Sequence, residues 1–247
     1  MSPEGIEAVE RATVAAVAPR RTAEIGGWLL ALEPGTIRRA ASAAPLAHDL
    51  PGDPAVLDQI EAAFAEAGMA PAFRLADAPG LEGVRAELAR RGYRFEQPTL
   101  VKTADAAAMR AVSTAQPAEV LERPDAGWAK VFTGEGFDPV DGANRVAALT
   151  RSPDAAYGAV REGEGTLAVG AAAFGHGWAS VHGMRTARDR RGEGLAGRVL
   201  AGLAEAAQAR GIDKVFLQVE EANAPARALY RRAGFERVWR YFYWSRG

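Results

Sequence analysis

The residues with the clearest chemical potential form a glycine-rich loop, Arg191-Gly192-Glu193-Gly194-Leu195-Ala196-Gly197. Its glycines and alanine leave the backbone nearly bare, so a bulky anion can approach it closely, and glycine tolerates the positive φ of a tight loop. Because the loop leads into an expected helix, free N–H groups and the helix dipole together provide a phosphate site. The spacing indicates a phosphate-bearing cofactor or, alternatively, a glycine-rich turn that caps a surface helix.

Two other phosphate-binding patterns fit this loop less well. The P-loop pattern ends in Gly-Lys-Ser/Thr, and no lysine lies in or beside the loop. Gly192, Gly194 and Gly197 have the Gly-x-Gly-x-x-Gly spacing of dinucleotide-binding proteins. However, the early βαβ unit and the acidic residue that accompany that pattern are missing.

The elements that must position this loop are predicted from periodicity, capping residues and β-branched content. In chain order they are a strand at 178–186, a helix from Leu195 to Arg210-Gly211, a buried strand at 214–219, a helix between Asn223 and Gly234, and an aromatic strand at 239–244.

In this region the chain resembles the GCN5-related N-acetyltransferases, the GNAT superfamily. The acetyl-CoA loop of that family follows Arg/Gln-x-x-Gly-x-Gly/Ala, which Arg191, Gly194 and Ala196 match. A second signature, Asn-x-x-Ala-x-x-x-Tyr-x-x-x-Gly-Phe after a strand, is matched by Asn223, Ala226, Tyr230, Gly234 and Phe235. The resemblance covers residues 117–247 and implies an α/β (α+β) GNAT fold, with a mixed central sheet flanked by helices.

The resemblance also implies where acetyl-CoA binds. The strand ending at Thr186 would splay from the 214–219 strand, and the gap would admit the pantetheine arm. The loop amides would hold the pyrophosphate, and Asn223 would touch the pantetheine or cap the next helix. The cofactor-binding residues expected are Met184, Arg185, Thr186, Arg191, Gly192, Glu193, Gly194, Leu195, Ala196, Gly197 and Asn223.

Amide formation from a thioester needs a neutral amine and a proton for the leaving thiolate. By resemblance, Tyr230 would place its hydroxyl near the sulfur as the general acid. A tyrosine of ordinary pKa, about 10, is protonated at neutral pH. The alternative is that Tyr230 is only a core aromatic residue.

The general base is left open between several groups. Some family members carry a glutamate at the position of Gln218, and an amide cannot take up a proton at neutral pH. Glu220 shares a strand face with Gln218 and is the best carboxylate candidate. His182 has an intrinsic pKa suited to base catalysis, although a structural role is the alternative. Water relay, or a substrate amine that arrives neutral, needs no side-chain base.

Composition excludes other chemistries. The 247 residues include no cysteine, which rules out disulfides and thiol catalysis, and the three histidines are scattered without metal-ligand spacing, so no metal is expected. A net charge of −1 gives no electrostatic basis for binding nucleic acid. The N-terminus lacks signal-peptide features and no apolar run is long enough for a bilayer, so no membrane association and a cytoplasmic location are expected.

Arg188 and Arg190 are either CoA-phosphate contacts or solvated loop charges.

The first half of the chain has its own predicted elements. They are helices at 6–17, 55–67 and 81–91, a hairpin of 25–32 with 36–44 around Glu33-Pro34-Gly35, and strands at 73–75 and 99–102.

Residues 87–93 repeat the pattern of 229–235, with Leu88 at the position of Tyr230. The segment 49–54 is acidic and interrupted by prolines, which is unsuited to a polyanion. We therefore expect a tandem protein with a degenerate GNAT-like unit at 1–104, a linker within 104–117 and a catalytic unit at 117–247. Such a chain should bind one CoA. A shared helix–turn–strand motif is the alternative explanation of the repeat.

The expected activity is transfer of an acetyl group from acetyl-CoA to an amine on a small molecule or peptide, by direct attack in a ternary complex. The alternatives are a CoA-binding regulatory or scaffold protein without turnover and a mycothiol-synthase-like enzyme. Irregular segments at 126–149 are expected to form the acceptor site, where Asp138, Asp141 and Asp154 could attract an amine. Gly27-Trp28 and Arg38-Arg39 could line that site. The alternative is that Trp28 is packed in the core and that the two arginines are solvated. Both monomer and homodimer remain open.

Overall fold

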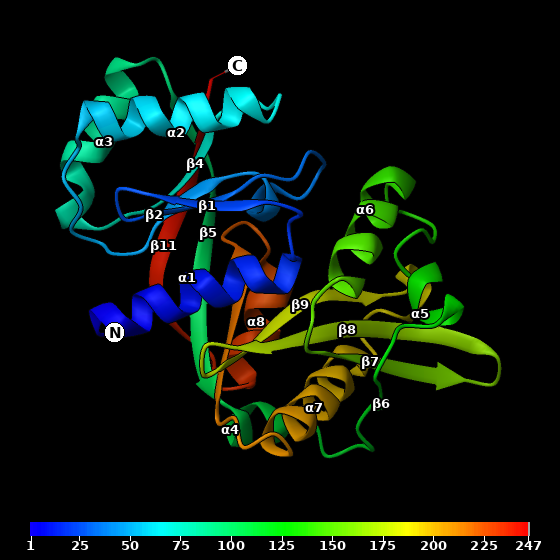
Figure 1. Ribbon diagram of the computed structural model, residues 1–247. Helices are drawn as coiled ribbons and strands as arrows, with labels where there is room; N and C mark the ends of the chain where they lie inside the picture. Colours follow the sequence, from blue (N-terminus) through cyan, green and yellow to red (C-terminus); the bar gives the residue numbers. More distant parts are fainter. Residues whose placement is uncertain (247) are drawn as a thin grey trace.

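A single mixed sheet with helices on both faces organises the computed structural model, which describes residues 1–246 (Figure 1). The predicted α/β class, a mixed sheet flanked by helices, is confirmed. Gly247, the last residue of the predicted catalytic unit, lies outside the described residues. The sheet has 11 strands in the order β1-β2-β3-β4-β11-β5-β10-β9-β8-β7-β6.

The strands are β1 (Thr22–Ile25), β2 (Trp28–Ala31), β3 (Ala43–Pro45), β4 (Ala72–Ala76), β5 (Arg94–Asp105), β6 (Glu119–Leu121), β7 (Ala155–Glu162), β8 (Gly165–Gly175), β9 (Trp178–Thr186), β10 (Lys214–Glu220) and β11 (Glu236–Ser245). The α-helices are α1 (Pro3–Val17), α2 (Pro54–Glu66), α3 (Glu82–Arg90), α4 (Ala106–Arg110), α5 (Ala126–Lys130), α6 (Pro139–Thr150), α7 (Leu195–Gln208) and α8 (Ala224–Arg232). Short 3₁₀ turns span Arg38–Ala40, Pro79–Leu81 and Arg188–Arg190.

The two halves of the chain exchange their last strands. β5, which closes the first half, lies between β11 and β10, and β11, which closes the second half, lies between β4 and β5 (Figure 1). β5 is antiparallel to both neighbours, and its pairing with β10 runs from Lys214↔Asp105 to Glu220↔Thr99. The sheet is therefore continuous across the expected boundary between the units.

The two larger apolar cores of the described chain lie against this sheet. α7 buries Val199, Leu200 and Leu203 against the second half, because its apolar residues recur every three to four positions. A second core joins α2, α3 and β4 to Tyr241 and Trp244 of β11. α1 belongs to the first half in sequence but contacts β8 and β9 of the second half. This placement brings the N-terminal helix to the centre of the sheet.

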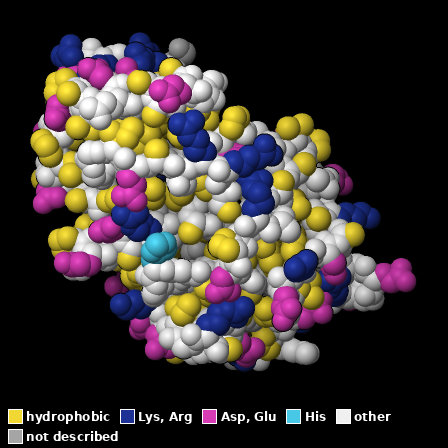
Figure 2. Space-filling view, viewed as in Figure 1, with side chains coloured by type: hydrophobic (Ala, Val, Ile, Leu, Met, Phe, Trp, Pro, Cys, Tyr) yellow, Lys and Arg dark blue, Asp and Glu magenta, His cyan; other side chains and the backbone are white. Residues whose placement is uncertain are grey.

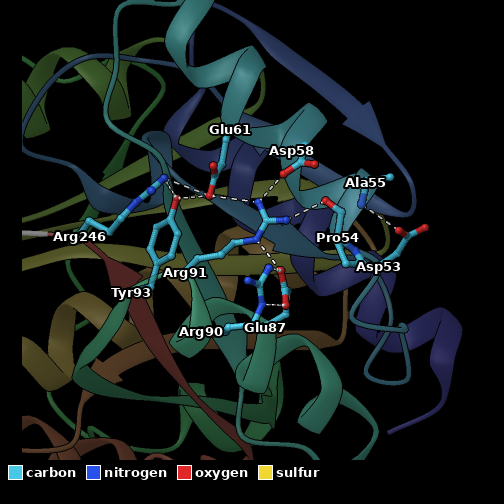
Figure 3. Close-up of polar contacts among 10 residues, drawn as sticks. All are labelled: Asp53, Pro54, Ala55, Asp58, Glu61, Glu87, Arg90, Arg91, Tyr93 and Arg246. Atoms are coloured by element: carbon cyan, nitrogen blue, oxygen red, sulfur yellow. Dashed lines mark hydrogen bonds and ion pairs between the residues drawn. The ribbon is translucent and has the colours of Figure 1, made fainter.

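A polar network fixes the outer helices of the first half (Figure 3). Arg91 donates to Glu87 at 2.8 Å and to Asp58 at 2.7 Å, which ties α3 to α2. Tyr93 donates its hydroxyl proton to Glu61 at 2.8 Å, and Arg246 donates to the Tyr93 hydroxyl at 2.7 Å. The C-terminal end of the described chain is thereby held against the first half.

The hairpin predicted around Glu33-Pro34-Gly35 is wrong. The two-residue turn is at Gly26-Gly27, where φ is +54° and +83°, and it joins β1 to β2. Two successive residues of positive φ form the turn whose twist matches that of paired strands, and glycine adopts it without steric cost. β2 then pairs with β3, and the segment between them carries the 3₁₀ turn Arg38–Ala40.

Two segments of the second half contain helices where irregular chain or a linker is expected. Residues 126–149 contain α5 and most of α6, which begin at the capping residues Asp125 and Asp138, while residues 131–137 between them are turns and bends, as expected. Within the expected linker 104–117, α4 packs against α7 and buries Met109. The sequence does not predict these helices, because their alanine and glycine residues obscure the apolar side of each one. In residues 1–246, none of the helices combines the length and apolar character that a bilayer crossing requires.

Candidate functional site

The site begins where two parallel strands separate. β9 and β10 pair from Val215↔Ala179 to Leu217↔Val181, and the pairing stops there although both strands continue. The splay expected between the strand ending at Thr186 and its neighbour is present. Beyond it, the backbone groups that face each other across the gap are available to a bound ligand.

A β-bulge helps to turn β9 away from β10. The pairing of β8 with β9 shifts register between Val169↔Arg185 and Ala171↔His182, and Gly183 within the bulge has φ +60°. A Cβ atom on Gly183 would lie 2.7 Å from Cδ1 of Leu149. This position therefore requires glycine for both its conformation and its close approach to α6.

A cavity of about 300 Å³ lies at the opening. β9, β10 and α8 line one part of it, and the turn after β2, together with β5, α6 and β11, lines the rest. The predicted site residues that it brings together are His182, Met184, Arg185, Glu220, Asn223 and Tyr230. Thr186 and the loop 191–197 follow immediately along the chain but do not line this cavity.

The alternation of β10 separates the candidate acid and base. Leu217 and Val219 join the core of α7, which also contains Tyr230. Phe216 joins the opposite core, and Gln218 donates from Nε2 to Oγ1 of Thr13 in α1 at 2.8 Å. Since side chains alternate along a strand, Glu220 lies on the α1 side. Tyr230 and Glu220 thus approach the opening from opposite faces of the sheet.

Tyr230 is held in its protonated form. Burial raises the pKa of its hydroxyl to about 12, and the nearby Arg185 guanidinium opposes that shift only in part. The ring packs against Phe235 with 5.9 Å between centroids. A buried, protonated phenol beside the cavity can donate a proton to a developing anion.

Glu220 is exposed to the cavity and is held by a single hydrogen bond, which Nε2 of Gln97 donates to Oε1 at 2.7 Å. Gln97 has φ +54°, an uncommon conformation for a residue other than glycine, at a bulge where β5 pairs with β11. Gln218, which stands where some relatives carry glutamate, accepts a hydrogen bond from Tyr241 at 2.9 Å. Its amide is structural, so Glu220 is the carboxylate that faces the cavity.

His182 is buried and neutral. Desolvation, aided by the charge of Arg39, holds the pKa of its imidazole well below the ordinary value of 6.5. Within residues 1–246 neither ring nitrogen has a hydrogen-bond partner. The ring can therefore accept or donate one hydrogen bond to a ligand, whereas proton uptake at neutral pH is unfavourable.

The glycine-rich loop has the conformation that a phosphate site needs. Gly192 and Gly194 have φ +89° and +78°, and a Cβ on either would meet open space. Gly194 precedes α7 without any side-chain cap, so the first N–H groups of this helix are available. Arg190 is engaged by Glu193 at 2.9 Å and by Glu162 at 2.7 Å, whereas the Arg188 side chain is 65% exposed.

Asn223 caps α8, because its side-chain oxygen accepts from the N–H of Ala226 at 3.2 Å. The capping role expected of it is confirmed. Of the acids expected to attract an amine, Asp138 caps α6 and Asp154 pairs with Arg210 at 3.4 Å. Asp141 accepts from Arg145 at 2.6 Å.

For several residues near the cavity, the sequence leaves two positions open or gives no indication at all. Trp28 is packed in the core, as one alternative held. Arg38 and Arg39 line the cavity instead of being simply solvated: Arg38 lies 4.1 Å from the Tyr243 ring centroid, and Arg39 donates to Gln218 at 3.4 Å. Gln97, Arg145 and Tyr241 also line it and were missed, since no local motif marks them.

Comparison with known proteins identifies the family and the fold. Residues 4–244 match the family described as Probable histone acetyltransferase Rv0428c C-terminal. A mycothiol acetyltransferase from Clavibacter michiganensis subsp. michiganensis is 48% identical over 59 residues, which are 24% of this chain and only 19% of that protein.

Two solved structures share the fold along nearly the whole chain. A GCN5-related N-acetyltransferase from Kribbella flavida is similar with a TM-score of 0.72 at 18% identity, over 97% of this chain and 95% of that one. A tandem GNAT protein from the clavulanic acid biosynthesis pathway has a TM-score of 0.64 at 15% identity, over 96% and 93%. The expected GNAT fold is confirmed.

Proposed function

We propose that this chain, which belongs to the Probable histone acetyltransferase Rv0428c C-terminal family, transfers an acetyl group from acetyl-CoA to an amine by direct attack in a ternary complex. The observation that carries the proposal is the end of β9–β10 pairing at Leu217↔Val181, with Tyr230 and Glu220 on opposite sides of the opening. GNAT-fold neighbours support acetyl transfer in general, and the finer assignment rests on these side chains.

The residues present suit acetyl-CoA. The N–H groups at the start of α7 and the bare backbone of Gly192 and Gly194 would hold the pyrophosphate. The unpaired edge of β9 at Met184, Arg185 and Thr186 would hydrogen-bond to the amides of the pantetheine arm. When bound, acetyl-CoA supplies the thioester carbonyl that the amine attacks.

Two proton transfers complete the reaction. The amine nitrogen forms a bond to the carbonyl carbon as the carbon–sulfur bond breaks, and the electron pair of that bond stays on the sulfur. Tyr230 donates its proton to the sulfur, and Glu220 accepts a proton from the amine, directly or through water. Before the next turnover the Glu220 carboxyl releases its proton to solvent, and the Tyr230 phenolate regains one.

Turnover is favoured over a regulatory CoA-binding role by one observation. The regulatory alternative rests on Gln218, because a glutamine cannot act as the base. Glu220, however, provides a carboxylate at the same cavity and on the same strand face. The 59-residue match to a mycothiol acetyltransferase keeps a mycothiol-synthase-like acceptor as a second candidate.

The test is release of the CoA thiol from acetyl-CoA in the presence of acidic, neutral and basic amines. Wild-type protein should turn over at least one amine, and both Tyr230→Phe and Glu220→Gln should lower kcat by about 100-fold or more. Acetyl-CoA affinity should change little in either variant, which calorimetry checks.

Glu221→Gln is the matched control, because Glu221 is the next residue but does not line the cavity. It should retain wild-type turnover. Tight acetyl-CoA binding with no turnover of any amine would instead support the regulatory alternative.

A further inference from the structure

The lining of the cavity is rich in arginine. Its lining includes Arg38, Arg39, Arg145 and Arg185, against Glu220 as the one carboxylate among the lining residues described. Figure 2 shows Lys and Arg side chains gathered where the first half meets the region of α6. The chain as a whole has a net charge of −1, so this concentration of positive charge is local.

Most of these guanidinium groups already have carboxylate partners. Arg38 lies 2.8 Å from Glu96, and Arg145 lies 2.6 Å from Asp141. Arg185 is 3.9 Å from the same Asp141, which is too long for a hydrogen bond. Its buried Nε has no hydrogen-bond partner in residues 1–246.

Arg39 is the least neutralised of the four. Among the described residues its guanidinium has no carboxylate within 4.0 Å, and its one side-chain hydrogen bond is a long one, of 3.4 Å, to the Gln218 amide oxygen. Gln218 is itself held by Thr13 and Tyr241, so the position facing Arg39 is fixed by α1 and β11. A half-buried cation with no counter-ion in a cavity is arranged to receive an anion.

We propose that the acceptor is a small molecule carrying a carboxylate as well as its amine, and that Arg39 binds the carboxylate. The inference rests on the proposed function and specifies its acceptor. Glu220 and Arg39 line the same cavity of about 300 Å³, a volume at the small end of ligand sites. Amine and carboxylate would thus be recognised by opposite charges within one compact site.

The same charges disfavour a highly basic acceptor. A lysine-rich peptide or a polyamine would bring further positive charge toward Arg39 and Arg185, and like charges brought together reject a ligand. An amino acid with a free carboxylate matches the site, whereas its carboxamide has nearly the same shape but no charge for Arg39.

The experiment compares free L-amino acids with their carboxamides, together with a lysine-rich peptide. Calorimetry on the CoA-loaded protein measures binding, and thiol release from acetyl-CoA measures turnover. We expect at least one acid to bind and react about 10-fold better than its amide. Arg39→Gln should abolish that preference by raising KM for the acid, while Arg39→Lys should keep part of it.

Arg20→Gln is the control for loss of a positive charge, since its side chain is 81% exposed and does not line the cavity. Equal binding of acids and amides, preference for the lysine-rich peptide, or an unchanged preference in Arg39→Gln would overturn the inference while leaving acetyl transfer intact. Arg39-dependent binding of an acid without turnover of any amine would support the carboxylate site and contradict the proposed transfer.

Discussion

At the residue scale, the proposed chemistry depends on keeping one proton in place. Tyr230 projects from α8 into the apolar core that α7 also forms, and burial raises the pKa of its hydroxyl to about 12. A phenol in this environment stays protonated at neutral pH and well above it. Glu220, by contrast, lies exposed at the cavity and accepts one hydrogen bond, from Gln97.

This difference predicts the shape of the pH–rate profile. As pH rises, more amine is neutral and kcat/KM should increase, and no loss of activity from Tyr230 should occur until the pH approaches about 12. Initial rates between pH 6 and about 10, with a melting curve at each pH, test this. A decline centred near pH 8 in protein that stays folded would show that a different group supplies the proton.

Local sequence could reveal only part of the site. Asn223, Tyr230 and the glycines lie within short signatures, so their spacing identifies them. Arg39, for which the sequence leaves solvation as the alternative, and Gln97, which no motif marks, reach the same cavity from the other half of the chain. They do so through the turn after β2 and a bulge in β5. Their position depends on long-range strand pairing, which no window of sequence contains.

At the element scale, the loop 191–197 leads directly into α7, and the proposed phosphate site uses both. The strand expected at 178–186 has those bounds in the structure. The first-half hairpin was misplaced because Pro34-Gly35 is a strong turn signal, whereas Gly26-Gly27 supplies the positive φ that the two-residue turn requires.

A bulky residue at Gly194 should abolish acetyl-CoA binding without unfolding the protein. Gly194→Val places a β-branched side chain at φ +78° and projects it into the space before α7 where the pyrophosphate would lie. The strain should cost about 1–3 kcal/mol of stability. Calorimetric titration with acetyl-CoA and thermal unfolding measure the two effects separately.

Gly211→Val is the matched control for this substitution. Gly211 has φ +69°, its Cβ would also meet open space, and it follows the other end of α7. It should show a similar loss of stability with normal acetyl-CoA binding. If Gly194→Val binds as well as Gly211→Val, the loop does not hold the cofactor.

At the scale of the whole molecule, exchange of β5 and β11 makes the two halves interdependent. Trp239 of β11 packs edge-on against His48 of the first half, with ring centroids 5.1 Å apart. Desolvation is the main cause that lowers the pKa of His48 to about 4; Arg74 adds to the shift and Asp49 opposes it. The contact between the exchanged strand and the first half therefore depends on a neutral imidazole.

Acid should weaken this contact in a defined range. Because the pKa of His48 is lower when folded than the unfolded value of 6.5, its neutral form stabilises the fold above pH 6.5, and that contribution is lost as the pH falls toward about 4. His48→Gln should flatten the dependence of unfolding free energy on pH in this range. Denaturant titrations at several pH values test it, and an unchanged slope would exclude His48 as a source.

The repeat of 87–93 with 229–235 predicts two related units, but no sequence pattern predicts the order of the strands. Each half's last strand lies inside the other half through the long-range pairing of β4, β11 and β5. We continue to propose one acetyl-CoA per chain, because Leu88 replaces the tyrosine and 49–54 replaces the glycine-rich loop in the first half.

The most direct test of the account is a crystal structure of the protein with acetyl-CoA. We predict the pantetheine arm between β9 and β10, the pyrophosphate at the start of α7, and the sulfur within about 3.5 Å of the Tyr230 hydroxyl. Glu220 should face the side of the thioester from which an amine can approach. Acetyl-CoA bound in the first half, or with its sulfur remote from Tyr230, would contradict the proposed site.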